Sequence, residues 1–330
     1  MSNDGPQRFI SLLGSAGLAS ILAVSAGIVH AQAWPVKPIR LVIGYTPGGA
    51  AEGTLRTFSQ KLEALLGQQL VVEYKPGAGA TIGADYTSKA VPDGYTLHLI
   101  DNGPLTIVPA GKKLPYDPLK SFTHIGLINV GGTVLIGHPS VQANTFDEIV
   151  KLARAKPGFL SYGTSGIGGT GHMSGELFKS VAKLDIVHVP YKGGGPAMAE
   201  LLGGQIPLLF SSLTPAVPQI KSGKLKAYAV TSLARSSAMP DVPTVAEMGF
   251  PGFEAVTYFG LVGPAGLPKE IVDKTSSALL TVLKDRDVQE AIKKQGYEPM
   301  PSTPEAMVER VRADLAKWTK VISEVGIKLE

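Results

Sequence analysis

Residues 39–66 read IRLVIGYTPGGAAEGTLRTFSQKLEALL and contain the pattern that decides the fold. The β-branched run 39–43 predicts a strand, and Pro47-Gly48-Gly49 predicts a turn directly after it. From residue 54 to residue 66 the apolar side chains recur at helical spacing. We expect the buried face of this helix to carry Leu55, Phe58, Leu62 and Leu65. A strand, a glycine turn and a helix in this order predict one unit of an α/β fold.

The same alternation continues along the chain. Further strands are predicted at residues 70–73, 95–100, 160–162, 186–189, 208–210 and 253–262. Further helices are predicted at residues 82–90, 269–283 and 304–325. Because strands that alternate with helices are typical of βαβ units, the pattern predicts a mostly parallel sheet.

The two series of elements predict two α/β lobes. Residues 34–133 and 233–330 are expected to form the first lobe, and residues 134–232 the second. We expect the chain to cross between them near residues 131–134 and 231–233, and the lobes to close on a ligand.

The composition excludes several classes of protein. With 44% hydrophobic and 18% charged residues among 330, the chain can bury a core, which excludes intrinsic disorder. The absence of cysteine excludes disulfides, thiolate zinc sites and a cysteine nucleophile. A net charge of +4 without a block of Lys or Arg argues against nucleic acid as a partner.

The N-terminus is typical of an exported protein. Residues 9–29 contain no charged side chain, and Ala31-Gln32-Ala33 fits the small-residue cleavage pattern of a signal peptide. We therefore interpret residues 1–33 as a signal peptide and expect the mature chain to begin near Trp34. A membrane-spanning helix is the alternative, since 21 uncharged residues could cross a bilayer.

Four glycine-rich segments follow predicted strands. They are residues 47–52, 75–80, 163–172 and 191–196. A glycine turn that opens a helix exposes backbone N–H groups at the positive end of the helix dipole, and so can bind an anion. The alternative is that glycine only permits tight turns, but four such segments favour a ligand site.

No catalytic, cofactor or metal motif is complete. Gly166 and Gly171 have P-loop spacing, but no lysine follows. Residues 163–167 do not match a nucleophile elbow, and residues 77–83 do not match a dinucleotide-binding fingerprint. His172 and Glu176 share a helix face, but nothing near them in the sequence completes a metal site. The sequence therefore predicts no enzyme, no cofactor and no metal, with an enzyme acting on a carboxylate as a remote alternative.

An ordered set of motifs resembles the Bug family, the periplasmic solute-binding proteins of tripartite tricarboxylate transporters. In the first part of the chain it comprises Trp34-Pro35, Lys37-Pro38-Ile39, Pro47-Gly48-Gly49 with Glu52 and Arg56, Pro76-Gly77-Ala78-Gly79, and Pro92-Asp93-Gly94-Tyr95-Thr96. It continues with residues 162–166, 172–178, 189–193 and 201–205. The resemblance covers residues 34–330.

The resemblance implies an α/β fold of the type II-like periplasmic binding protein class, a two-lobed clamshell with a ligand cleft between the lobes. It implies that backbone amides and hydroxyls from one loop of each lobe hold a carboxylate. The matching positions on the first lobe are Tyr45, Thr46, Pro47, Gly48, Gly49 and Glu52. Those on the second lobe are Thr164, Ser165, Gly166, Gly168, Thr170, Tyr191 and Gly193.

Some of these positions have plainer interpretations. Position 52 is usually Asp in the family, and Glu52 is also explained by its place in the first turn of a helix, with Arg56 as its i, i+4 partner. Lys192 is expected to be a solvated charge and His188 a core residue. We expect Gly49 to need a positive φ, which a larger residue would resist. Pro207 stands where the family usually has Asp, so specificity is expected to differ.

The function predicted in this way is capture of a small organic mono- or dicarboxylate in the periplasm for uptake by the membrane subunits of such a transporter. We expect the protein to be a monomer. The alternative is a periplasmic sensing module that presents its ligand-bound form to a sensor kinase.

Overall fold

The computed structural model describes Met1 and residues 34–329. Apart from Met1, the predicted signal peptide at residues 1–33 lies outside the described residues. In the described part of the chain, no helix is both long enough and apolar enough to cross a membrane. The chain from Pro35 onward belongs to one compact unit.

One part of the sheet carries the N-terminal strands. It contains β1 (Ile39–Ile43), β2 (Leu70–Tyr74), β3 (Thr96–Asp101) and β9 (Val256–Pro264). Strands β2, β1 and β3 are parallel neighbours, and β9 runs antiparallel to β3. The helices associated with this part are α1 (Ala50–Leu66), α2 (Thr81–Ser88), α3 (Val108–Gly111), α8 (Lys269–Leu283), α9 (Arg286–Lys294) and α10 (Pro304–Val325).

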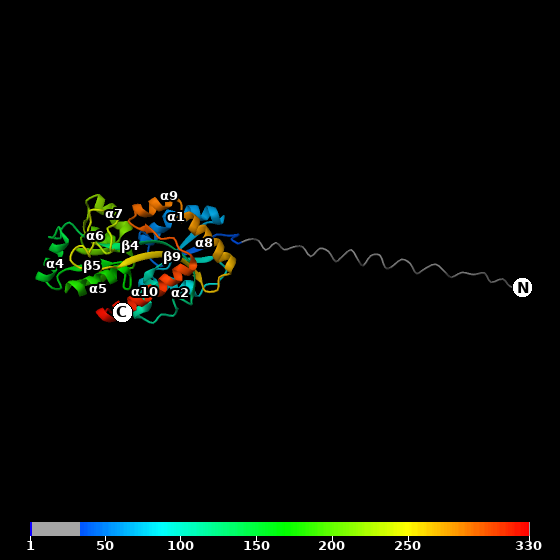
Figure 1. The fold of residues 1–330 in the computed structure, drawn as a ribbon, viewed down its shortest axis with the longest axis horizontal. Helices are drawn as coiled ribbons and strands as arrows, with labels where there is room; N and C mark the ends of the chain where they lie inside the picture. The colour runs from blue at the N-terminus through cyan, green and yellow to red at the C-terminus, as the bar shows by residue number, and fades with distance from the viewer. Residues whose placement is uncertain (2–33, 330) are drawn as a thin grey trace. The chain divides into compact units, whose positions relative to one another are not determined.

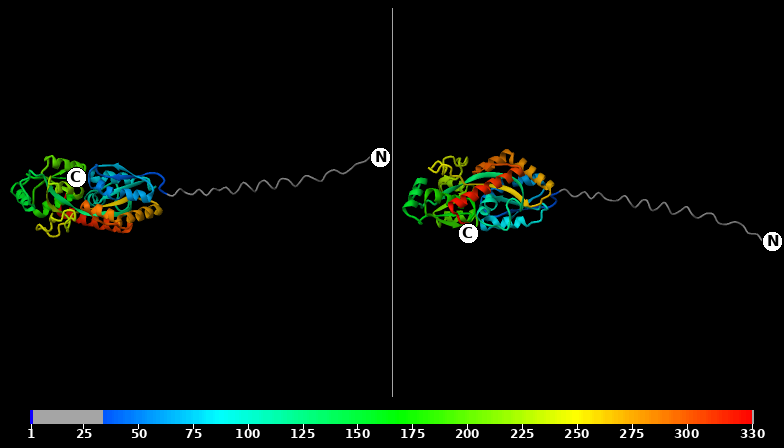
Figure 2. Two further views of the ribbon diagram at one scale, coloured as in Figure 1. Left: turned by 90° about the horizontal axis from the view of Figure 1, so that it is seen from above. Right: turned by 60° about the horizontal axis from the view of Figure 1, so that its bottom comes forward.

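The other part of the sheet carries the middle of the chain. Its strands are β5 (Ser161–Thr164), β6 (Val187–Pro190), β7 (Leu208–Ser212) and β8 (Lys226–Val230). Its helices are α4 (Phe146–Ala155), α5 (Thr170–Ala182), α6 (Gly194–Leu202) and α7 (Leu213–Lys221). Figures 1 and 2 show these green elements gathered at one end of the compact unit, with blue α1 and orange α8 and α9 at the other.

The long strand β4 (Phe122–Gly137) connects the two parts. Its residues 122–132 pair with β9, and its residues 133–137 pair with β7. The strand order is β2-β1-β3-β9-β4-β7-β5-β6, and β8 and β10 (Glu298–Pro299) also pair with β4. The change of partner at residues 132–133 lies inside one predicted crossing, whereas the lobe boundaries and their closure stay predictions.

The expectation of a mostly parallel sheet is wrong, because the sheet is mixed. Strand β9 lies antiparallel between β3 and β4, and β4 is antiparallel to β7, β8 and β10 as well. The apolar pattern that identifies a strand does not depend on the direction in which the strand runs. A strand that returns from far along the chain can therefore enter the sheet in either direction.

Apolar clusters of described residues stabilise this arrangement, and three of them involve different parts of the sheet. One lies in the first part of the sheet around Tyr258 and Met307, and one in the second part around Phe146 and Phe210. Val245 and Phe253, from the segment before β9, pack in the second of these clusters. The third cluster joins Trp318 of α10 to Met173 of α5. It connects a helix of the first part to a helix of the second.

Helix α1 begins four residues earlier than predicted, at Ala50. Leu55, Phe58 and Leu62 are buried as expected, but Leu65 is 50% exposed. Leu66 takes the buried position instead, because it lies four residues after Leu62.

Candidate functional site

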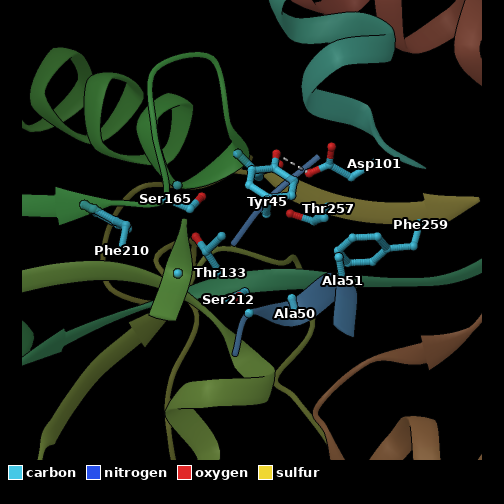
Figure 3. Close-up of a pocket in the computed structure, with 14 residues that line it drawn as sticks. Tyr45, Ala50, Ala51, Asp101, Thr133, Ser165, Phe210, Ser212, Thr257 and Phe259 are labelled. Carbon is cyan, nitrogen blue, oxygen red and sulfur yellow. Dashed lines mark hydrogen bonds between the residues drawn. The ribbon is translucent and has the colours of Figure 1, made fainter. Parts of the chain in front are cut away.

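A cavity lies where the two parts of the sheet meet, and Figure 3 shows its lining. About 480 Å³ of space lies between its walls, a volume that includes open solvent. The lining residues are Tyr45, Gly49, Ala50, Ala51, Asp101, Thr133, Ser165, Thr170, Gly171, Gly194, Phe210, Ser212, Thr257 and Phe259. Among these, Asp101 carries the one carboxyl group, and none is Lys, Arg or His.

Four of the residues predicted from the sequence line this cavity. Tyr45 and Gly49 come from the loop after β1, and Ser165 and Thr170 come from the loop after β5 and the start of α5. The structure therefore brings together the two glycine-rich loops that were expected to meet.

Another group of predicted residues lies where the first loop meets the loop before α6. The Thr46 hydroxyl donates to the Lys192 carbonyl at 3.4 Å. A Cβ at Gly193, whose φ is +155°, would collide with that hydroxyl. Gly48 faces Gly195, since a Cβ on Gly48 would lie 3.8 Å from the Gly195 Cα. Thr46, Gly48 and Gly193 thus keep two backbone segments close together rather than lining the cavity.

Pro47 and Gly49 occupy the same turn. The Pro47 carbonyl would lie 2.7 Å from a Cβ on Gly195, which leaves no room for a side chain there. The expectation of a positive φ at Gly49 is wrong, because its φ is −94°. Gly48 has the positive φ, at +85°, since the chain turns one residue earlier than expected. A Cβ on Gly49 would meet nothing nearer than 3.9 Å.

Glu52 faces its own helix end and is not among the residues that line the cavity. Its carboxylate accepts the Gly48 N–H at 2.7 Å and pairs with Arg56. The Gly48 hydrogen bond is the main cause that lowers the Glu52 pKa, and Arg56 lowers it further. These contacts match the plainer interpretation of Glu52 and of Arg56.

Two histidines contact the second loop, which follows β5 and leads to α5. The Thr164 hydroxyl oxygen is buried and accepts the Gly166 N–H at 3.2 Å. It also lies 2.7 Å from the His188 Nε2 atom. His172 accepts the Gly168 N–H at its Nδ1 atom, at 3.2 Å, and stacks on His188 with 4.3 Å between ring centroids.

Both histidines are held neutral. Burial lowers the pKa of His172 to about 4 and that of His188 to about 3. A neutral ring leaves Nδ1 of His172 free to accept the Gly168 N–H. Among the described residues, no group of three or more His, Asp or Glu side chains is placed to hold a metal ion. The sequence motif around His172 thus has a structural use that spacing alone did not predict.

Tyr191 lines a neighbouring hollow instead of the cavity described above. This hollow encloses about 530 Å³ of empty space, and Tyr45 and Ser165 border both spaces. Gly77–Ala80 form its opposite wall, and Lys192, which is exposed, lies beside Tyr191. A Cβ on Gly79 would collide with the Ile167 carbonyl oxygen, so the two walls are in direct contact.

Four helices begin at the cavity. The first residues of α1, α5 and α6, and the residue before α7, contribute Ala50, Ala51, Thr170, Gly171, Gly194 and Ser212 to its lining. None of these four helices has a side-chain hydrogen bond at its N-cap, which is Gly49, Gly169, Gly193 and Ser212 respectively. Because the first N–H groups of a helix have no intrahelical partner, the cavity is bordered by donors from several directions.

The hydroxyls of the lining connect the two parts of the sheet. The Thr170 hydroxyl donates to the Asn102 side-chain oxygen at 3.2 Å, and the Asn102 amide donates to the Val256 carbonyl at 3.0 Å. The Thr133 hydroxyl lies 2.9 Å from that of Ser174 and 3.1 Å from that of Thr231. The Thr170 hydroxyl is thus already engaged, while its backbone N–H lies in the first turn of α5.

Asp101 is the main residue that sequence reasoning missed. It is 6% exposed, and the Tyr45 hydroxyl donates to its Oδ2 atom at 2.8 Å (Figure 3). Burial raises its pKa to about 7, although the Tyr45 hydrogen bond acts in the opposite direction. Asp101 ends β3, and ligands of α/β proteins bind at the carboxyl ends of strands, so its position was the signal that could have found it.

This chain is similar to known receptors over most of its length. The family model described as "Tripartite tricarboxylate transporter family receptor" matches residues 54–327. Protein BugT of Bordetella pertussis is 31% identical over 324 residues, which cover 97% of this chain and 98% of BugT.

Solved structures show the same likeness. The periplasmic binding protein BugD is 34% identical, with a TM-score of 0.86 over 89% of this chain and 99% of that one. R. palustris Rpa4515 with adipate is 31% identical, with a TM-score of 0.86 over 89% and 99%. MatC from Rhodopseudomonas palustris with bound malate is 30% identical, with a TM-score of 0.83 over 87% and 99%. These likenesses confirm the predicted α/β fold of a periplasmic binding protein.

Proposed function

The chain belongs to the family of tripartite tricarboxylate transporter receptors, the Bug proteins, and we propose that it binds a small organic mono- or dicarboxylate in the periplasm. It delivers this anion to the membrane subunits of a tripartite transporter. The family is one of solute-binding receptors, so the proposed role involves no catalytic step.

The observation that carries this proposal is the set of four helix N-termini at one cavity. Each helix is at least nine residues long, and none is capped by a side chain. A helix N-terminus carries about half a positive charge, and its free N–H groups can each donate to an anion. Because none of the described residues that line the cavity is basic, these N–H groups supply the attraction for a carboxylate.

The predicted site residues then divide into two roles. Tyr45, Gly49, Ser165 and Thr170 contact the carboxylate or the part of the ligand next to it. The other predicted positions shape the loops that present these groups, and they are Thr46, Pro47, Gly48, Glu52, Thr164, Gly166, Gly168, Tyr191 and Gly193. Phe210 and Phe259 add apolar surface for the carbon skeleton.

Binding of an anion is tested with a panel of adipate, malate, succinate and benzoate. Each acid is compared with its methyl ester, in which every carboxyl group is esterified. A carboxylate at about 100 times its dissociation constant adds about 2.7 kcal/mol of stability, which raises the melting temperature of a chain this size by several degrees. The esters lack the negative charge and should give almost no shift. Equal shifts from an acid and its ester would contradict recognition through helix N-termini.

Transport is tested in cells. Deletion of the gene should abolish uptake of the carboxylate that binds, and the intact chain should restore it. Uptake that continues without the chain would favour a sensing role. Native mass spectrometry of the protein from its own periplasm would identify the carboxylate it carries.

Export and oligomeric state complete the proposal. The apolar run 9–29 followed by Ala31-Gln32-Ala33 supports a cleaved signal peptide at residues 1–33. N-terminal sequencing of the periplasmic protein should therefore begin near Trp34. Sedimentation should give the mass of a monomer. Recovery of the chain from Met1 in the membrane fraction would contradict export.

A further inference from the structure

Asp101 has an unusual position for an acid in an anion-binding cavity. It lines the space into which four helix N-termini point, and it is 6% exposed. Its Oδ2 atom accepts the Tyr45 hydroxyl, whereas its buried Oδ1 atom has no hydrogen-bond partner among the described residues. The backbone N–H groups of Asp101 and Gly103 are near enough to lower its pKa, but neither forms a hydrogen bond of normal geometry with Oδ1. Figure 3 shows the carboxyl group beside Tyr45 and Thr257.

The groups that face Asp101 share one property: they stay uncharged near neutral pH. They are Tyr45 from the loop after β1, Tyr116 from the segment before β4, Tyr258 from β9 and Tyr297 from the segment before β10. Burial raises the pKa of each of these tyrosines. Among the described residues that influence Asp101, none is a cation.

An ionised Asp101 would oppose the ligand that the helix N-termini attract. Two negative charges in a site with little water repel each other strongly, so a bound carboxylate favours the protonated acid. A protonated carboxyl group has an O–H to donate, and a carboxylate oxygen is a strong acceptor. Pairing of the two would supply a hydrogen-bond partner for Oδ1 of Asp101, which has none among the described residues.

We propose that Asp101 is a specificity-determining residue, which donates its proton in a hydrogen bond to a carboxylate oxygen of the ligand, so that the anion and one proton bind together. This inference rests on the proposed function, because it concerns the same cavity. It selects anions that place a carboxylate oxygen against Asp101. A ligand that places a cationic group against Asp101, such as an amino acid, would instead be attracted by the ionised acid. Amino acids should therefore not follow the pH dependence expected of simple carboxylates.

The test measures the dissociation constants of adipate and of malate by calorimetry between pH 6 and pH 8.5, where both probes stay ionised. If Asp101 must be protonated in the complex, both constants should rise about 10- to 30-fold over this range. Titrations at pH 7.5 in buffers of different ionisation enthalpy should show uptake of about 0.5 to 1 proton per anion bound. This measurement on the unmodified protein does not depend on whether any variant folds.

Variants separate titration from packing. Asp101→Asn keeps an N–H donor but cannot titrate, so its pH profile should be flat and its proton uptake absent. Tyr45→Phe removes a hydrogen bond that lowers the Asp101 pKa, so the loss of affinity should move to higher pH. The matched control is Asp314→Asn, a buried acid that accepts the Thr106 hydroxyl outside the cavity lining, and it should keep the original profile.

The outcomes distinguish the inference from the function. Binding that is equally tight from pH 6 to pH 8.5, without proton uptake, would overturn the role of Asp101 and leave the carboxylate receptor intact. A pH profile that survives in Asp101→Asn would also overturn it. Failure of every carboxylate in the panel to bind at any pH would overturn the proposed function itself.

Discussion

The helices of this protein begin in two different ways, and all four that border the cavity begin without a side-chain cap. Away from the cavity, α4, α9 and α10 are capped by the side chains of Thr145, Asp285 and Thr303, each of which accepts a backbone N–H of the first turn, whereas α2, α3 and α8 have no side-chain cap. At the cavity, α1, α5, α6 and α7 begin at Gly or Ser without such a bond. A cap is worth about 1 kcal/mol to a helix, so the four helices at the cavity lack a stabilisation that α4, α9 and α10 have.

The uncapped helix ends show where backbone N–H groups of this protein stay available to a ligand. A cap satisfies the N–H groups that an anion would otherwise bind. Glycine at the N-cap leaves those groups open and allows a second backbone segment to approach closely, as Gly193 does beside Thr46. The loops at the cavity are instead held by contacts beneath them, such as the Gly168 N–H to His172.

The largest expected effect is a loss of folding stability at acidic pH. The pKa of His172 is about 4 in the folded protein and near 6.5 when unfolded, so the unfolded state binds more protons between these values. The contribution of neutral His172 to the free energy of unfolding is therefore fully present above pH 6.5 and is lost as the pH falls toward 4. At about 1.4 kcal/mol per pKa unit, the loss is on the order of 3 kcal/mol. Denaturant unfolding should show that His172→Gln costs less at pH 4.5 than at pH 7.5, or even stabilises.

A capped helix supplies the control for this experiment. Lys61 is the main cause that lowers the Asp285 pKa below its usual range. Asp285→Asn should therefore cost the same stability at pH 7.5 as at pH 5. An equal cost for His172→Gln at both ends of the pH range would show that the loop at the cavity does not depend on a neutral histidine.

The second prediction fills one uncapped helix end. Gly49→Val places a branched side chain at the start of α1, where an added Cβ meets nothing nearer than 3.9 Å. The fold should tolerate it, but the side chain would block approach to the N–H groups of α1. Since a hydrogen bond to a charged group is worth about 1.5–3 kcal/mol, loss of one or two of them should weaken carboxylate binding on the order of 100-fold. Calorimetry measures the affinity, and a thermal melt without ligand checks the fold. Normal affinity in Gly49→Val would remove α1 from the site.

The third prediction compares the loss of a hydroxyl at a capped helix end with the same loss at an uncapped helix end. Thr303→Ala removes a cap on α10 and should cost about 1 kcal/mol of stability without changing affinity. Ser212→Ala removes a hydroxyl that lines the cavity but forms no cap on α7. It should change the free energy of unfolding by less than about 0.5 kcal/mol while weakening binding about tenfold. The reverse pattern in melts and titrations would mean that helix ends at the cavity are stabilised like the others.

The two loops of the site were predictable because their chemistry is local. The glycines of Pro47-Gly48-Gly49 and of residues 163–172 predict turns and helix starts, so both loops could be expected near a ligand. The family resemblance then supplied the individual residues, among them Tyr45 and Ser165, which line the cavity. A positive φ at Gly48 rather than Gly49 was beyond prediction, since it depends on where the turn falls.

The strand residues of the site were not predictable, because they depend on pairing. Thr257 and Phe259 line the cavity only because β9 enters antiparallel beside β3, which sets Asp101 opposite Phe259. Thr133 lines it because β4 changes partner at that residue. Apolar periodicity identifies a strand but does not say which strand lies next to it, or in which direction it runs.

The smallest expected effect concerns Lys192, the cation beside the neighbouring hollow. Its side chain is exposed, and its carbonyl rather than its charge makes the contact to Thr46. An exposed charge is screened by water and salt and contributes about 0–1 kcal/mol, so Lys192→Ala should weaken carboxylate binding by less than about fivefold at 0.15 M salt. The small loss should shrink further as the salt concentration rises, because only long-range attraction is removed. Calorimetry of adipate and malate at two salt concentrations measures both quantities. If Lys192→Ala abolished binding while Gly49→Val did not, the carboxylate would be held by an ion pair, and the uncapped helix ends would have no part in recognition.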